Sequence, residues 1–206
     1  MLKVYVILML QCLFTALATA GVYFHEPTKK WMADHYYLHY VSMGLGIALM
    51  IVLMCFKKIA RKVPVNYFLL LAFTLVWSYM VAGYTMKFPP EIVLCAASTT
   101  FVMTVGLTIV ALFMKKDITK FGGALGAASL CLIPLILFSF FFPSRILYIV
   151  ICVVVIVLSS IYIVYDTQRL TRGHLQFDEY IIGALSLYTD IINLFMALLG
   201  LGGQVA

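Results

Sequence analysis

Two aspartates lie inside apolar stretches of this 206-residue chain, where a charged side chain is costly. Asp166 comes near the end of the run 146–166, and Asp190 lies in the middle of the run 180–201. A carboxyl group at membrane depth is usually paired, protonated or in contact with a watery path. Two carboxylates that meet do not both ionise at low cost, so they titrate as a unit and can share one proton. The pair therefore predicts a pH-responsive gate for cations, because ionised carboxylates attract a cation and a protonated pair holds two helices together.

Polar and small residues share one face of the helix predicted for 180–201. They recur every three or four positions, at Gly183, Ser186, Asp190, Asn193, Ala197 and Gly200. Asp190 lies about 15 Å into this run at 1.5 Å per residue, which is near the middle of a bilayer. Calcium prefers oxygen ligands. We therefore predict transient calcium binding by Asp166 and Asp190, with Ser186 and Asn193 lining the pore.

A second polar stripe occurs in the apolar run 92–114, where threonines repeat every four residues at Thr100, Thr104 and Thr108. Hydroxyl groups at this spacing commonly bond back to carbonyls of their own helix, which favours a role in helix packing. A pore-facing stripe through Thr100 and Thr104 is the alternative.

The aspartates also allow two interpretations without ion passage. A satisfied polar pair would only fix the packing of two helices. An intramembrane aspartyl protease also carries two membrane aspartates, and Tyr165-Asp166 matches one of its motifs. Its second motif, Gly-x-Gly-Asp, is replaced here by Leu187-Tyr188-Thr189-Asp190, and the Pro-Ala-Leu element is missing downstream. We therefore expect that the protein is not an enzyme and uses no cofactor, with calcium only as the permeant ion.

The composition indicates that the solvent of this chain is lipid. The chain is 65% hydrophobic and 11% charged, whereas soluble domains carry roughly 25% charged residues. A helical span needs about 20 apolar residues, and runs of about this length follow one another with short connections. We predict an all-α, polytopic membrane protein in which residues 1–206 form a single transmembrane domain, a seven-helix bundle. The expected spans are about 4–24, 37–56, 65–84, 92–114, 121–142, 146–166 and 180–201.

Basic residues set the expected orientation. Ten of the 14 Lys and Arg residues lie at the amino-terminal end and in the second, fourth and sixth connections. The positive-inside rule therefore places the amino terminus in the cytosol. Because these residues cluster at span ends, the net charge of +6 requires no nucleic-acid partner. Lys3, the apolar stretch after it and Ala18-Thr19-Ala20 also fit a cleaved signal peptide, in which case six spans would remain.

Around the aspartates, the chain resembles the transmembrane Bax-inhibitor motif family. The matching runs are Ile163-Val164-Tyr165-Asp166-Thr167-Gln168, Asp178-Glu179-Tyr180 and Leu185-Ser186-Leu187-Tyr188-Thr189-Asp190-Ile191-Ile192-Asn193-Leu194-Phe195. Further matches favour the Lifeguard branch, near the Golgi anti-apoptotic proteins, and extend the resemblance over nearly the whole chain. They are Lys3-Val4-Tyr5 with Leu10-Gln11, Phe73-Thr74-Leu75, and Lys115-Lys116-Asp117 with Lys120-Phe121-Gly122.

The resemblance implies a seven-span bundle and a cation leak, chiefly of calcium out of internal stores. It places the pH-sensing pair at Asp166 and Asp190. It also implies a basic residue near the second span that locks the pair in the closed form, for which Lys58 and Arg61 are both candidates. Lifeguard members often carry a glutamate where this chain has Trp77, so an ion-pathway role of that position is not carried over.

The acidic residues Asp178 and Glu179 match those at the entrance to the last span of the family, which implies a cytosolic vestibule. A solvated helix start, stabilised by the helix dipole, is the alternative. We thus predict a pH-sensitive calcium leak channel of an internal membrane, Golgi or endoplasmic reticulum, that modulates store calcium and cell death. Its expected partners are the lipid bilayer, calcium, protons and other membrane proteins of cell-death control. The alternatives are a non-conducting adaptor and a proton-coupled calcium exchanger.

Overall fold

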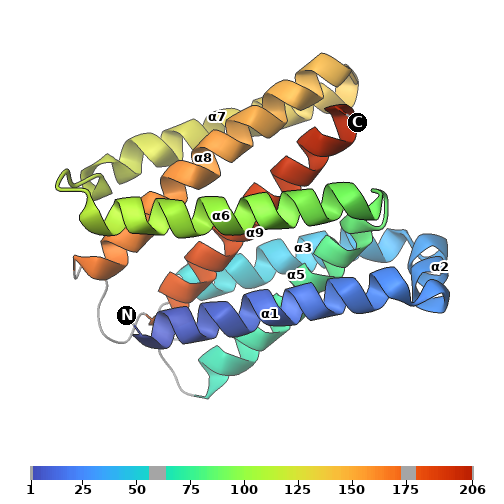
Figure 1. Cartoon of the computed structure of the whole chain (residues 1–206), viewed down its shortest axis with the longest axis horizontal. Coiled ribbons are helices and arrows are strands. Elements are labelled where there is room, and N and C mark those ends of the chain that lie inside the picture. Colours follow the sequence, from blue (N-terminus) through green and yellow to red (C-terminus); the bar gives the residue numbers. More distant parts are fainter. Residues whose placement is uncertain (1, 56–63, 173–179, 206) are drawn as a thin grey trace. The chain divides into compact units, whose positions relative to one another are not determined.

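Every regular element in the described part of the chain is a helix (Figure 1). The computed structural model describes residues 2–55, 64–172 and 180–205. The helices are α1 (Leu2–Phe24), α2 (Glu26–Asp34), α3 (Tyr37–Cys55), α5 (Val65–Thr85), α6 (Pro90–Phe113), η1 (Thr119–Phe121), α7 (Gly122–Phe141), α8 (Arg145–Thr171) and α9 (Tyr180–Val205). They divide into two compact units, residues 1–89 with 175–188 and residues 90–174 with 189–206, so that one boundary falls inside α9, between Tyr188 and Thr189.

The predicted all-α, polytopic fold is confirmed. Six segments are long and apolar enough to cross a membrane, namely α1, α5, α6, η1 with α7, α8 and α9. The predicted span 37–56 corresponds to α3, which is preceded by the unpredicted short helix α2. These two helices are bent by 84° and give a seventh span if they count as one. The organisation of 1–206 as a single domain stays a prediction.

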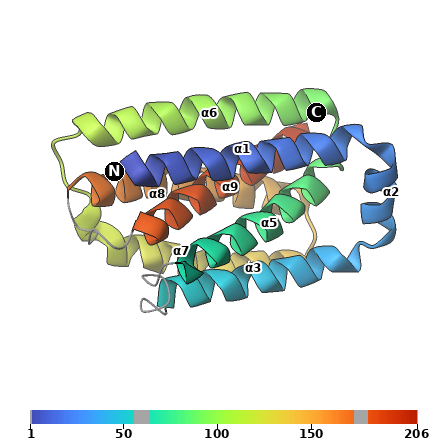
Figure 2. The same ribbon diagram turned by 90° about the horizontal axis from the view of Figure 1, so that it is seen from below.

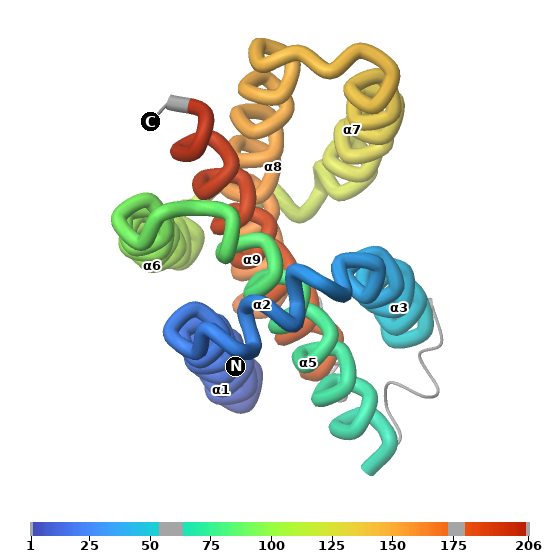
Figure 3. The backbone as a smooth tube through the Cα atoms, turned by 90° about the vertical axis from the view of Figure 1, so that its right-hand side faces the viewer, coloured from blue at the N-terminus to red at the C-terminus, as the bar shows by residue number. Residues whose placement is uncertain are grey.

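The first unit is built around α5. Both α1 and α3 pack against α5, which lies between them in Figure 2, and α2 joins the ends of α1 and α3 (Figure 3). At Gly46 of α3, an added Cβ would lie 3.2 Å from the indole Nε1 of Trp77. Trp77 therefore packs closely against α3, and a larger side chain at position 46 would press against its indole ring.

The second unit is built around α8, with α6 and α7 on either side of it (Figure 3). The helix continues to Thr171, five residues past the predicted end of the span at Asp166. Hydropathy marks where lipid ends, whereas a helix continues as long as its residues favour it, and Gln168 and Arg169 are good helix formers. Asp166 thus lies inside α8, more than one turn before its end, and has helical backbone on both sides.

Candidate functional site

The carboxyl groups of Asp166 in α8 and Asp190 in α9 meet in the second unit. The two carboxyl groups lie close enough for their charges to interact and for a hydrogen bond to form between them. Asp166 is only 7% exposed, and Oδ2 of Asp190 is buried without a hydrogen-bond partner among the described residues. Because an ionised carboxylate only accepts hydrogen bonds, a bond between two carboxyl groups requires a proton on one of them. A proton shared by the pair, like the role of the pair as a gate, stays a prediction.

The other predicted pore-lining residues do not all lie in the same unit as the aspartates. Asn193 lies on α9 in the second unit and is half-buried. The hydroxyl of Thr100 donates to the carbonyl of Ala96 at 2.7 Å, within its own helix α6, as the packing interpretation expects. Oγ1 of Thr104 is buried and has no partner in the described ranges, so it is the better candidate for contact with a passing ion. Ser186 belongs to the first unit.

Four predicted site residues fall outside the described part of the chain. They are the gate-locking candidates Lys58 and Arg61, and the vestibule candidates Asp178 and Glu179. Their roles stay predictions.

The described residues contain no group of three or more His, Cys, Asp or Glu side chains that could hold a metal ion. Calcium in a stable site takes six to eight oxygen ligands. Asp166 and Asp190 alone supply far fewer, and the transient calcium binding expected of the pair stays a prediction.

Two side chains near the end of α8, which the sequence did not single out, anchor the segment between α6 and η1. Gln168 is fully buried. Its Oε1 accepts from the backbone N–H of Ile118 at 2.9 Å, and its Nε2 donates to the carbonyl of Lys116 at 3.0 Å. Arg172 donates to the carbonyl of Met114 at 2.8 Å. Met114 follows the carboxyl end of α6, where the helix dipole makes a positive charge stabilising. The helical turns that follow Asp166 are thereby fixed to the preceding connection.

Sequence comparison decides the family of this chain. A family model described as "Inhibitor of apoptosis-promoting Bax1" matches residues 1–205. The chain belongs to the Bax1-I family. This Bax1-I protein is 34% identical to Protein LIFEGUARD 1 of Arabidopsis thaliana, over 97% of the chain and 86% of that relative. It is 36% identical to Protein lifeguard 4 of Mus musculus, over 96% of the chain and 81% of that relative. It is 32% identical to the Golgi anti-apoptotic protein of Vaccinia virus, over 97% and 82%.

A polar seam in the first unit of the Bax1-I protein is a further feature that sequence reasoning missed. Nε2 of Gln11 donates to Oγ1 of Thr74 at 2.9 Å. The hydroxyl of Thr15 shares hydrogen bonds with Ser78 at 2.9 Å and with Tyr188 at 2.7 Å. The spacing of four between Gln11 and Thr15, and between Thr74 and Ser78, could have predicted two matching faces. The seam ties α1 to α5 and to the first turns of α9.

We expect Thr15→Val to destabilise the Bax1-I protein by about 1–2 kcal/mol, because Ser78 and Tyr188 each lose a buried partner on another helix. Thr100→Val is the matched control, since Thr100 is equally buried but bonds only within its own helix. Thermal unfolding in detergent should show a lower apparent Tm for Thr15→Val than for Thr100→Val. Equal values for the two variants would mean that the bonds between helices add nothing.

Proposed function

We propose that this protein is a calcium leak in an internal membrane, gated by the pair Asp166 and Asp190. The closeness of these two carboxyl groups, which interact with each other, carries the proposal. A hydrogen bond between them would join α8 to α9, and both helices are long and apolar enough to span a membrane. While one proton is shared, the bond holds the two helices together. Loss of the shared proton leaves two ionised carboxylates, which repel each other and cannot hydrogen-bond, so the contact between the helices responds to pH.

Oxygen atoms near the pair support passage of a hard cation such as calcium. The unpartnered Oδ2 of Asp190 is already available for a new contact. Asn193 follows Asp190 by one turn on the same helix and offers a carbonyl oxygen. Once the carboxyl groups separate, these oxygens would replace part of the ion's hydration shell. The protein needs no catalytic group or cofactor for this role.

Membership of the Bax1-I family supports a role in restraining cell death. A calcium leak provides a route to that role, because the leak sets the calcium content of the store. The relative named Golgi anti-apoptotic protein supports the Golgi as the membrane concerned. The excess of Lys and Arg in alternate connections supports a cytosolic amino terminus.

The proposal is tested with purified protein in liposomes that contain a calcium indicator. We expect calcium to move down its own gradient when the pH is equal on both sides, at a rate that changes when this common pH is changed. The double variant Asp166→Asn/Asp190→Asn, which has no carboxyl group at either position, should lose the response to pH. Movement only with an imposed proton gradient would show an exchanger instead. No movement under any condition would leave the non-conducting adaptor.

A further inference from the structure

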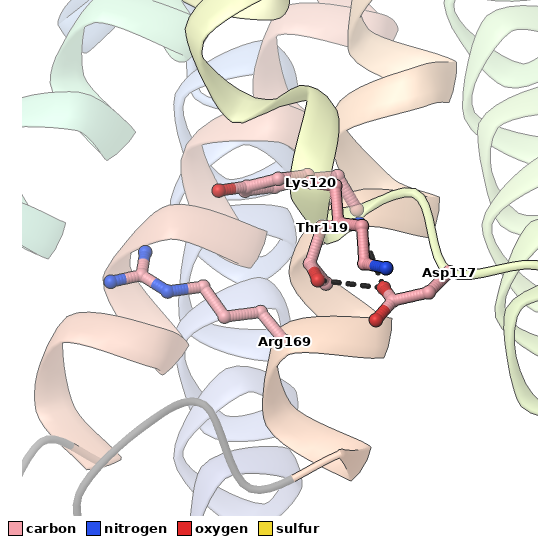
Figure 4. A pocket seen from close by; sticks show the side chains of 5 residues that line it. Asp117, Thr119, Lys120 and Arg169 are labelled. Carbon is pink, nitrogen blue, oxygen red and sulfur yellow. Dashed lines mark hydrogen bonds between the residues drawn. The ribbon is translucent and has the colours of Figure 1, made fainter.

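A pocket of about 310 Å³ lies within the second unit, between the segment that leads into α7 and the last turns of α8 (Figure 4). Its lining residues are Asp117, Thr119, Lys120, Tyr165 and Arg169. Ligand pockets in proteins usually measure roughly 300–1,000 Å³. This pocket is at the small end of that range, so its size fits a compact polar group.

The pocket is lined by two positively charged side chains, Lys120 and Arg169. The described residues offer no ion pair or hydrogen bond to the side chains of Lys120 and Arg169. The one acid among the lining residues is already satisfied. Asp117 Oδ1 accepts from the backbone N–H of Thr119 at 3.0 Å and from its hydroxyl at 2.6 Å, and Oδ2 lies 3.6 Å from Nη1 of Arg172. Figure 4 shows Arg169 extending away from Asp117. Two cations are therefore free to bind an anion.

The pocket lies at the polar ends of two candidate membrane spans. One span starts at Thr119, and Tyr165 and Arg169 belong to the last turns of the other, Arg145–Thr171. Phe121, next to Lys120, is 53% exposed, and exposed aromatic side chains are typical of the membrane interface. Basic pockets between membrane helices on the cytosolic side are suited to phosphorylated lipid headgroups. A group bound here would lie where lipid headgroups lie.

We propose that this pocket binds a phosphate group, presented by an anionic lipid headgroup or by free phosphate. The planar guanidinium of Arg169 matches phosphate geometry, and the ammonium of Lys120 adds a second charge from the other wall. The hydroxyl of Tyr165 has no hydrogen-bond partner in the described ranges and supplies a neutral donor. Because neither Asp166 nor Asp190 takes part, the site is independent of the proposed calcium leak.

The test is native mass spectrometry of the full chain in detergent, titrated separately with phosphatidylinositol 4-phosphate, with phosphatidylcholine and with inorganic phosphate. The pocket variant is Lys120→Gln/Arg169→Gln. The matched control is Lys115→Gln/Lys116→Gln, which removes the same charge from exposed side chains of the same connection that do not line the pocket. We expect the phosphorylated lipid to bind better than phosphatidylcholine. The pocket variant should weaken this binding by about tenfold or more, and the control should leave it nearly unchanged.

The arms of this experiment separate the two sources of phosphate. If inorganic phosphate binds the wild type without any lipid, and this binding is lost in the pocket variant, free phosphate is supported as the ligand. Binding of the lipid only supports the headgroup. Equal losses of binding in the pocket variant and the control would overturn the proposal, since they would indicate diffuse electrostatic attraction. The absence of any preference for phosphorylated lipid would overturn it as well. Tyr165→Phe provides a milder variant that keeps both charges and should weaken binding by a smaller factor. Equal elution volumes and apparent Tm values for all variants check that each is folded.

Discussion

The substitution Asp190→Asn is expected to leave a low rate of calcium release that no longer responds to pH. The side-chain amide introduced on α9 would donate a hydrogen bond to the Asp166 carboxylate, and this bond requires no titratable proton. The contact between α8 and α9 would then persist at every pH, whereas the proposed mechanism makes the wild-type contact depend on a shared proton. The change in release rate across the pH range should fall by about five- to tenfold, which corresponds to an ordinary coupling free energy.

The measurement is the initial rate of calcium release from liposomes at a series of pH values, equal on both sides, for wild type, Asp190→Asn and Asp166→Asn. The two single variants should behave alike, because either one removes the shared proton. Glu91→Gln is the matched control, since it makes the same carboxyl-to-amide change at an exposed residue in the first turn of α6. If Asp190→Asn follows the pH profile of the wild type, the pair is not the sensor and the gating mechanism is wrong.

Gln168→Ala is expected to lower stability by about 2–3 kcal/mol, because it leaves two backbone groups of another segment without partners. The N–H of Ile118 loses its acceptor and the carbonyl of Lys116 loses its donor, both at a side chain that is fully buried. For a chain of about this length, the apparent Tm should fall by roughly 5–10 °C. The decrease can be measured by thermal unfolding in detergent.

Two comparisons make this stability prediction specific. Gln204→Ala removes the same side chain from a half-buried position on α9 and should change the apparent Tm little. Gln168→Glu keeps the acceptor for Ile118 but places a buried carboxylate oxygen against the carbonyl of Lys116, so it should lower stability at least as much as alanine does. An unchanged apparent Tm for Gln168→Ala would show that water or other groups replace both bonds.

Several features of this protein could be predicted from the sequence because they depend on local pattern. Apolar runs of about 20 residues identify helices that need lipid around them, whatever their neighbours are. The predicted spans accordingly match α1, α5, α6, α7, α8 and α9, with α3 in the bent pair. The motifs around Asp166 and Asp190 led to the family that the comparison confirms. A carboxyl group inside an apolar run also stands out without any knowledge of its partner.

Other features were decided only by tertiary contacts. The end of α8 at Thr171 is stabilised by the bonds of Gln168 to residues about 50 positions earlier in the chain. The polar seam joins Gln11 to Thr74 across 63 positions. The pocket of Lys120 and Arg169 exists because η1 and α8 lie side by side. Hydropathy describes how each residue interacts with lipid or water. It does not predict which distant segments form hydrogen bonds with each other. The sequence therefore specifies which helices enter the membrane, and the tertiary structure specifies which of their polar atoms bond to one another and which have no partner among the described residues.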